Sequence, residues 1–493
     1  MSFTSCSFIV FFLITFSIYW ALPERYRWIL LLLSSLTFYA FAGPIYLVVL
    51  VSTILVNYFL AVEIDRKQEN KNRNHLLFWG IVLNLIVLSI FKYYDAASEL
   101  LAQEFHLAPN SSSIPVLVMP LGISFYTFTS ISYLIEVKRR NIEAEKHLGY
   151  FSVYITFFPK LIMGPIERPQ FFLPQVNRKK VFDYNQATQG MRLILLGAFK
   201  KLVVANRMAN FVNPVFEDPW KYSGISLAVA VVFFAVQIYA DFSGYIDIAR
   251  GISNLLGFNL SHNFNRPYAA RSIKEFWSRW HITLSTWLRY YIFLPIAYSL
   301  SRRFGRDHYL RLRTDHFLYL IAITITFLIC GIWHGVGWTF LIWGLLFVIY
   351  LSIARLTEKG RRKLRKVIGI SKVPWLDNSI QVIATFLLVC FAWIFFKSQD
   401  IDDAYLIIRS VFNITSWTFH VNLFGKENLP EFLITIFLMA LILFLTINKK
   451  AYSSLIFGIA KPKLFRWTLY FVITALILYF GVFNNYQFIY FQF

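Results

Sequence analysis

The sequence predicts an all-α polytopic membrane protein with about 10–13 transmembrane or re-entrant helices, taking the usual ~20 residues per span. Hydrophobic residues make up 57% of the 493-residue chain and charged residues only 15%, whereas a soluble domain carries about 25% charged residues. Long apolar runs recur along the whole chain, and the basic residues gather in short segments between them. This pattern is typical of membrane spans joined by loops, of which the cytoplasmic ones collect Lys and Arg.

The apolar runs that we expect to form helices occur from one end of the chain to the other. They lie near residues 7–22, 28–42, 45–62, 76–92, 115–135, 189–205, 225–248, 318–332, 337–353, 379–396, 431–447 and 467–484. The first run lacks a basic leading segment and a small-residue cleavage site, so it is expected to be a helix and not a signal peptide. The densest basic segment, 355–372, is expected in the cytoplasm, which places the amino terminus and residues 398–430 outside.

Two apolar regions do not fit simple spanning helices. Residues 153–174 contain four prolines and a glycine, and proline breaks a helix by removing an N–H donor and by steric clash. We expect a re-entrant or interfacial element there, because irregular backbone at membrane depth needs protein or water partners. Residues 318–353 would form a helix of about 54 Å at 1.5 Å per residue, far too long for one span. The glycines between Gly331 and Gly337 predict two half-length helices that meet at a corner and place His334 within the membrane.

The composition excludes several other classes of protein. The formal net charge is +22, but no basic face is interleaved with exposed aromatic residues on a polar domain, so no nucleic-acid partner is expected. Three cysteines without a CxxC spacing predict neither a disulfide framework nor a zinc site. The chain also lacks the P-loop, the GxSxG and the HExxH motifs. We expect no metal and no bound cofactor.

Ionisable residues inside a membrane are costly and are therefore functional candidates. His334 leads, because glycines on both sides of it would let a ligand approach, and imidazole exchanges protons near neutral pH. The alternative is a histidine that only packs between helices. His281 follows an aromatic and arginine-rich stretch, which is also typical of an interfacial amphipathic helix. In the functional interpretation it joins His334 in one cavity. Asp241, late in an apolar run, has either a structural role or a role in the cavity.

Two blocks of sequence carry a resemblance to a known family. The first, about residues 264–295, reads FNRPYAARSIKEFWSRWHITLSTWLRYYIFLP, and the second, about 331–347, begins GIWHGVGWTFLIWGLL. Both resemble the signature blocks of membrane-bound O-acyltransferases, in the bacterial branch that contains alginate O-acetyltransferase and the D-alanine-transferring protein of teichoic acids. MPLGISFYTF, GPIERPQFFLPQV, QIYADFSGYIDIARG, FAWIFFKSQDIDDA and the final FIYFQF also resemble that branch, so the likeness extends over nearly the whole chain.

The resemblance implies the fold and the site. It implies one membrane domain, residues 1–493, whose helices ring a tunnel or funnel. His334 matches the family's catalytic histidine, and His281 matches its second motif histidine. Residues near these two or in a matched segment are candidates for binding substrate: Trp333, Trp280, Asp241 and Arg289.

The resemblance also implies the reaction, which is acyl transfer from a cytoplasmic thioester to an extracytoplasmic hydroxyl. The donor would be acyl-CoA or an acyl carrier protein, and acetyl is the expected acyl group. His334 would be the general base, whereas His281 would position a reactant or bond to the thioester oxygen. The acceptor would be a polysaccharide, as in alginate biosynthesis, reached directly or through an extracytoplasmic partner protein. We expect a multi-pass protein of the bacterial inner membrane.

The sequence departs from the family pattern at three places. Tyr290 stands where alginate-type members usually carry an aspartate, Phe347 stands in place of a histidine, and residues 297–301 replace a Gly-Gly-Asn-Arg segment. The resemblance therefore does not identify alginate as the acceptor. Two other functions stay open: a transporter or flippase for an anionic or lipid-linked substrate, which also needs broken helices and buried polar groups, and an acyltransferase for long-chain lipid or protein substrates.

Overall fold

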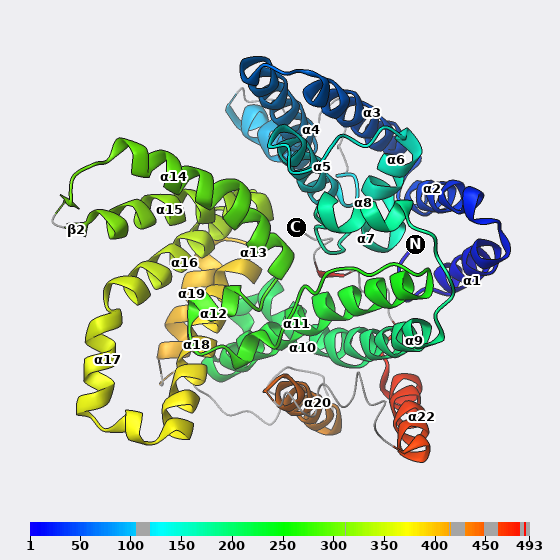
Figure 1. The fold of residues 1–493 in the computed structure, drawn as a ribbon. Helices are drawn as coiled ribbons and strands as arrows, with labels where there is room; N and C mark the ends of the chain where they lie inside the picture. The colour runs from blue at the N-terminus through cyan, green and yellow to red at the C-terminus, as the bar shows by residue number, and fades with distance from the viewer. Residues whose placement is uncertain are drawn as a thin grey trace. The chain divides into compact units, whose positions relative to one another are not determined.

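A computed structural model describes residues 1–104, 119–310, 312–413, 415, 429–447, 462–483 and 488–489. Within this part of the chain the predicted all-α fold is confirmed (Figure 1). The strands described there form one short antiparallel pair, β1 (His308–Tyr309) with β2 (Leu312–Arg313). Outside the described residues lie the first residues of the expected run 115–135, residues 414 and 416–428 within the segment 398–430, and the residues after 489.

The predicted apolar runs all coincide with helices, because a continuous apolar run satisfies its backbone within a helix. These helices are α1 (Cys6–Ala21), α2 (Glu24–Ala40), α3 (Ile45–Arg66), α4 (Asn70–Glu104), α5 (Ile123–Lys138), α9 (Tyr184–Ala198) with the π-helix Phe199–Ala205, α11 (Gly224–Leu255), α15 (Thr314–His334), α16 (Trp338–Leu356), α18 (Pro374–Lys397), α20 (Leu429–Ile447) and α22 (Lys463–Phe480). Among the described residues, seven helices are long and apolar enough to cross a membrane. They are α3, α4, α11, α15, α16, α18 and α22. The chain is therefore a polytopic membrane protein.

The chain divides into two compact units. One comprises residues 1–194 and 245–261, and the other comprises residues 195–244 and 262–493. Helices α9 and α11 contribute residues to both units. The single domain and the tunnel expected from the sequence stay predictions.

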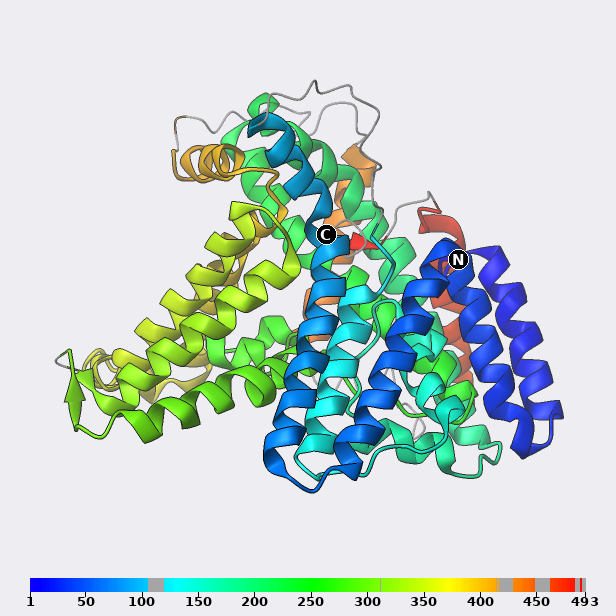
Figure 2. The ribbon, with the colours of Figure 1, turned by 90° about the horizontal axis from the view of Figure 1, so that it is seen from above.

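The first unit begins with paired helices. Helices α1 and α2 run side by side in the blue part of Figure 2, and α3 packs against α4 and α5. Two buried amides join α3 to α4: Asn57 donates to the side-chain oxygen of Asn84 at 3.1 Å, and Asn84 donates in return at 2.8 Å. This reciprocal pair satisfies polar groups that would be costly to bury alone.

The proline-rich region of the first unit is broken, as predicted. Instead of one spanning helix it forms α6 (Leu148–Thr156), α7 (Phe158–Leu161) and α8 (Pro169–Asn177). Protein groups satisfy the irregular backbone between these helices, since the Tyr154 hydroxyl donates to the Glu167 carbonyl at 2.9 Å. The buried carboxylate of Glu167 accepts from the backbone N–H and the hydroxyl of Ser261, at 2.6 and 2.8 Å. The interruption therefore has the internal partners that its burial requires.

The second unit contains a helical hairpin of α15 and α16. The predicted break is confirmed, because α15 ends at His334 and α16 begins at Trp338. The apolar run thus divides into two helices of similar length, as predicted: α15 has 21 residues and α16 has 19, and both are long enough to span. The apolar run underestimated α15, because the helix begins in the polar residues Thr314–His316, ahead of that run.

Shorter helices complete the second unit around this hairpin. They are α10 (Asn206–Glu217), α12 (Ile273–Trp277), α13 (Ile282–Leu288), the π-helix Arg289–Phe293, α14 (Leu294–Arg303), α17 (Glu358–Val367) and α19 (Ile401–Phe412). Three single 3₁₀ turns lie at Pro219–Lys221, Pro267–Ala269 and Ile370–Lys372. Helix α17 connects α16 to α18 and has no buried residue (Figure 1).

A buried ion pair joins α11 to the π-helix within the second unit. Lys201 Nζ lies 2.6 Å from Asp241 Oδ1, and each side chain is only 3% exposed. The other carboxylate oxygen of Asp241 accepts the backbone N–H of Ile489 at 2.6 Å, while the Lys201 ammonium lies 4.2 Å from the ring centre of Phe488. The carboxyl-terminal residues 488–489 therefore complete a charged cluster in the core.

Candidate active site

His334 is the last residue of α15, at the corner between α15 and α16. The two helices approach each other closely there, because a Cβ on Gly344 would lie 2.6 Å from the Phe327 carbonyl oxygen, and one on Gly331 would lie 2.6 Å from that of Phe340. Such distances leave no room for any side chain, so glycine is required at both positions. The close approach fixes His334 against the first turns of α16.

Aromatic rings surround the imidazole of His334. The ring centres of Trp333, Trp343 and Phe396 lie 4.7, 4.9 and 5.2 Å from that of His334, all in edge-to-face geometry. We call these three residues the aromatic enclosure. His334 itself is 4% exposed. An enclosure of this kind excludes bulk water, which strengthens any hydrogen bond that His334 makes to a reactant.

Two buried indole N–H groups lie in the same cluster. Trp393 stacks on Trp343 with ring centres 6.2 Å apart and contacts Phe396 at 5.1 Å. Among the described residues, neither Trp343 Nε1 nor Trp393 Nε1 has a hydrogen-bond partner. A buried N–H without a partner is costly and is therefore a candidate to donate to a reactant.

His281 lies in a tight turn between α12 and α13. Its φ angle is +43°, in the left-handed region that few non-glycine residues adopt. The turn replaces the continuous amphipathic helix that the aromatic and arginine-rich sequence also allowed. Strained backbone of this kind persists only where its surroundings hold it, and it concentrates at functional sites.

Asn263 holds this turn. Its backbone carbonyl accepts the N–H of Ile282 at 2.9 Å, and its side-chain oxygen accepts the N–H of Thr283 at 3.1 Å. The first N–H groups of a helix have no partner within the helix. Asn263, from a segment eighteen residues earlier, thus caps α13 in place of the residue at its own start.

The structure brings both predicted histidines to one ring, that of Trp333. The Trp333 ring centre lies 6.3 Å from that of His281 and 4.7 Å from that of His334. Trp280, which precedes His281, lies 5.2 Å from Trp393 in the cluster around His334. Four of the six predicted site residues, His334, His281, Trp333 and Trp280, therefore lie in one aromatic cluster of the second unit.

The other two candidate residues, Arg289 and Asp241, have their contacts with residues outside this aromatic cluster. Arg289 is exposed, and its guanidinium lies 5.8 Å from the ring centre of Tyr290. Both carboxylate oxygens of Asp241 are engaged, one by Lys201 and one by Ile489. The substrate-binding roles of these two residues, and the catalytic roles of the histidines, stay predictions.

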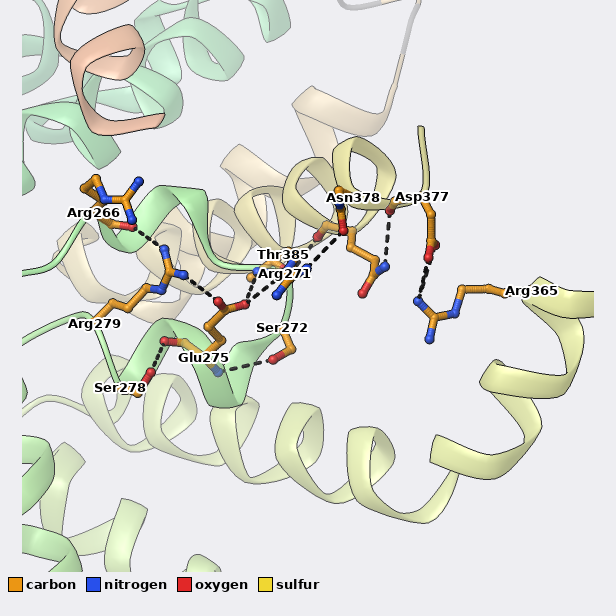
Figure 3. A network of polar contacts seen from close by, with 11 residues as sticks. Arg266, Arg271, Ser272, Glu275, Ser278, Arg279, Arg365, Asp377, Asn378 and Thr385 are labelled. Atoms are coloured by element: carbon orange, nitrogen blue, oxygen red, sulfur yellow. Dashed lines mark hydrogen bonds and ion pairs between the residues drawn. The ribbon is translucent and has the colours of Figure 1, made fainter. Parts of the chain in front are cut away.

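A polar network precedes His281 in the chain (Figure 3). Glu275 accepts from the Arg279 guanidinium at 2.6 Å and from the backbone N–H of Arg271 at 2.7 Å. The Arg271 guanidinium in turn donates to the side chain of Asn378 on α18 at 3.1 Å. These contacts tie α12 to α18 and shape the segment that leads into the His281 turn.

Sequence reasoning missed Asn263, Trp343, Trp393 and Phe396, which surround the two histidines, and it missed Lys201, the partner of Asp241. Trp343 lies in the second block, and Trp393 and Phe396 lie in the FAWIFF segment that also carried the resemblance. A lysine within the apolar run 189–205 should also have indicated a buried partner. Asn263 had no such signal, because its role depends on a turn that the sequence did not predict.

The described residues contain no group of three or more His, Cys, Asp or Glu side chains that could hold a metal ion. The three cysteines are unpaired, with Cys330 and Cys390 buried and Cys6 exposed.

These features define a polytopic membrane protein with two buried histidines in an aromatic cluster. The family model of MBOAT, the membrane-bound O-acyltransferase family, matches residues 82–397, which include the cluster. The chain therefore belongs to the membrane-bound O-acyltransferase family and is an O-acyltransferase. This assignment excludes the alternative function of a transporter or flippase, which the sequence left open.

Curated relatives carry related names. The probable alginate O-acetylase AlgI of Pseudomonas aeruginosa is 32% identical over 430 residues, which cover 85% of this chain and 76% of that protein. The peptidoglycan O-acetyltransferase of Helicobacter pylori is 32% identical over 77% of this chain and 73% of that protein. The teichoic acid D-alanyltransferase of Streptococcus thermophilus is 30% identical over 56% of this chain and 68% of that protein.

Proposed function

We propose that this O-acyltransferase moves an acetyl group, or another short acyl group, from a cytoplasmic thioester to a hydroxyl of an extracytoplasmic polysaccharide. The names of the relatives support a short acyl group and a cell-surface glycan or polymer as acceptor. The donor is acyl-CoA or an acyl carrier protein, and the acceptor is reached directly or through an extracytoplasmic partner protein. The bacterial inner membrane is the proposed location.

The observation that carries the mechanism is the placement of His334. It is the ionisable residue of the second block, it is 4% exposed, and aromatic rings enclose it on three sides. A neutral imidazole there acts as the general base that a hydroxyl needs, since a hydroxyl is a poor nucleophile until its proton is removed. Such assistance is worth about 10²–10⁴-fold in rate.

The reaction balances with one base. His334 takes the proton of the acceptor hydroxyl as its oxygen attacks the thioester carbon, and the negative charge develops on the carbonyl oxygen. The indole N–H groups of Trp343 and Trp393 are candidates to donate to that oxygen. The C–S bond then breaks, and the imidazolium of His334 returns the proton to the leaving thiolate. The products are the O-acyl ester and the free thiol.

The exposed helix α17 supports a cytoplasmic, anionic donor. It carries the basic residues Lys359, Arg361, Arg362, Lys363, Arg365 and Lys366, and none of its residues is buried. Positive charge concentrated on one surface raises the local concentration of an anionic donor, whether coenzyme A phosphates or an acidic carrier protein. This attraction should weaken as salt is raised.

The test compares the wild type with His334→Ala and with the exposed control His308→Ala, all purified in detergent. Each is given radiolabelled acetyl-CoA, then an acetylated carrier protein, with and without periplasmic proteins of the same source. We expect thioester loss in the wild type and in His308→Ala, and a fall of at least about 10²-fold in His334→Ala. Full activity of His334→Ala would exclude His334 as the base.

The labelled product then identifies the acceptor. Label on a polymer supports direct transfer, whereas label on a periplasmic protein supports a relay. A parallel assay with palmitoyl-CoA tests the long-chain acyltransferase that the sequence left open. A faster reaction with palmitoyl than with acetyl would contradict the short-acyl proposal.

A further inference from the structure

The side-chain oxygen of Asn263 faces three hydrogen-bond donors or potential donors. The backbone N–H and the hydroxyl of Thr283 donate to Asn263 Oδ1 at 3.1 and 2.9 Å, and His281 Nδ1 lies 3.2 Å from the same atom. Asn263 is 1% exposed and His281 is fully buried. The amide and the imidazole therefore meet in a buried part of the second unit.

The amide orientation of Asn263 follows from chemistry. A backbone N–H is always a donor, so the Asn263 atom that faces the N–H of Thr283 must be the oxygen and not the NH₂ group. His281 Nδ1 faces that same oxygen, which only accepts hydrogen bonds. Nδ1 must therefore carry a hydrogen.

The charge state of His281 then determines whether its second nitrogen, Nε2, carries a hydrogen or a lone pair. Among the contacts of the imidazole, the rings of Phe242 at 4.8 Å and Trp333 at 6.3 Å are uncharged, as are Asn263 and Thr283. Burial lowers the pKa of His281 to about 3, because it disfavours the imidazolium. A neutral imidazole has one N–H and one lone pair. With the hydrogen on Nδ1, the lone pair lies on Nε2.

We infer that Asn263 is a positioning residue that fixes the tautomer of His281, so that His281 Nε2 accepts a hydrogen bond from an O–H or N–H group of a bound reactant. This inference rests on the proposed acyl transfer. Of the two roles that the sequence left open for His281, it selects positioning of a reactant and excludes donation to the thioester oxygen. The developing charge on that oxygen is then stabilised by other donors, such as the indole N–H groups.

The reactant group bound by His281 is distinct from the attacking hydroxyl, because that hydroxyl gives its only proton to His334. Two sources have the right chemistry. One is a neighbouring hydroxyl of a sugar acceptor, and the other is an amide N–H of the thioester arm of the donor. When the tautomer of His281 is no longer fixed, the first source predicts a rise in KM for the acceptor, and the second predicts a rise in KM for the donor.

The experiment compares Asn263→Ala, Asn263→Asp and Thr283→Val with the wild type. Asn263→Ala removes the acceptor, so both tautomers of His281 are populated. We expect kcat/KM to fall roughly 10- to 100-fold. This loss is smaller than the ~10⁴-fold loss of kcat that follows when the tautomer-fixing carboxylate of a serine-protease triad is neutralised. A rise in KM for the donor identifies the amide N–H, and a rise in KM for the acceptor identifies the sugar hydroxyl. Thr283→Val removes another donor to the same oxygen and should keep the rate within about twofold.

Asn263→Asp gives a readout that a merely structural role would not move. It keeps the acceptor oxygen and the tautomer, but it places a carboxylate beside the imidazole, which favours the imidazolium and raises the His281 pKa. We therefore expect near-normal activity at high pH and a loss of activity on the acid side that begins at a higher pH than in the wild type. An acid limb identical to that of the wild type would overturn the inference, even if Asn263→Ala fails to fold.

A measurement without turnover separates this inference from the proposed function. In protein labelled with ¹⁵N-histidine, the signal that disappears in His281→Gln belongs to His281. We expect it to show hydrogen on Nδ1 in the wild type and a mixture of tautomers in Asn263→Ala. Hydrogen on Nε2 in the wild type would overturn the inference, whatever the enzyme acylates.

Discussion

Two buried polar pairs lie in the second unit, Lys201–Asp241 and Asn263–His281, and only the first is charged. The ion pair has a 2.6 Å contact, and its carboxylate also accepts a backbone N–H. The second pair joins a neutral amide to a neutral imidazole at 3.2 Å. Both pairs are nearly inaccessible to water, so the difference in charge determines what each can do.

A buried charge needs its partner at all times, whereas a neutral group tolerates a change of partner. Removing one member of a buried ion pair leaves a charge without compensation, at a cost of about 3–5 kcal/mol. A neutral buried group that loses a hydrogen bond costs about 1–3 kcal/mol. Lys201–Asp241 is therefore suited to holding the fold, and His281 is suited to exchanging its contacts with a reactant.

The largest expected effect comes from breaking the ion pair. Lys201→Met leaves the Asp241 carboxylate buried, and Asp241→Leu leaves the Lys201 ammonium against the Phe488 ring. We expect each to lower the free energy of unfolding by about 3–5 kcal/mol, measured as loss of folded protein in detergent during heating. The double variant should recover much of this loss, because apolar residues often replace a buried ion pair without net cost.

The exposed pair Lys221–Asp218, with side chains 76% and 40% exposed, gives the matched control. Lys221→Met should melt as the wild type does, since exposed ion pairs contribute little. If the double variant is as unstable as the sum of the two single variants, the pair is not coupled. The comparison with Asn263–His281 would then lose its basis.

A smaller effect is expected where His334 is held by packing. Gly344→Ala places a Cβ 2.6 Å from the Phe327 carbonyl oxygen, so α15 and α16 must separate. We expect a loss of about 1–3 kcal/mol, as for other overpacked sites, together with a fall in kcat, because Trp343 of the aromatic enclosure lies on α16 and moves with it. Melting temperature and single-turnover rate would measure the two effects.

Gly337→Ala is the control for this substitution. Gly337 is exposed, and the nearest atom to its added Cβ is the Thr339 hydroxyl at 3.3 Å, the end of a side chain. Its stability and rate should stay close to those of the wild type. Equal losses in the two variants would show that the glycines act through loop flexibility and not through close helix packing.

Local chemistry explains how much of this structure the sequence could predict. Apolar length predicts the helices, and the prolines of residues 153–174 and the glycines after Gly331 predict the breaks, because each acts on its own backbone. The closeness of His281 to Trp333 and His334 depends on two segments that meet only in the fold. Sequence reasoning proposed that the histidines share a site, but it had no means to place Trp343 or Trp393 beside them.

The Asn263 contact shows the limit most clearly. Nothing in the local sequence indicates that this asparagine caps a helix eighteen residues away, since a helix normally takes its cap from the residue at its own start. Asp241 shows the opposite case. Its position in an apolar run marked it as important, but its partners, Lys201 and Ile489, are 40 and 248 residues away along the chain.

The smallest effect is expected at the half-exposed network before His281. Glu275→Gln weakens the ion pair with Arg279, whose side chain is 21% exposed, but keeps an oxygen for the backbone N–H of Arg271. Such pairs contribute about 0–1 kcal/mol. The turn itself keeps its backbone bonds, from Asn265 N–H to the Arg279 carbonyl and from Ile282 N–H to the Asn263 carbonyl. We therefore expect kcat within about twofold of the wild type.

A matched variant on α17, Glu358→Gln, breaks an exposed pair with Arg362 that has the same spacing along a helix. The two variants should have the same melting temperature and the same rate at saturating donor. A tenfold loss of kcat confined to Glu275→Gln would mean that the Arg279 ion pair, and not Asn263 alone, orients the His281 turn. In that case the neutral pair would depend on a charged one, and the division between a charged scaffold and a neutral reacting group would have to be redrawn.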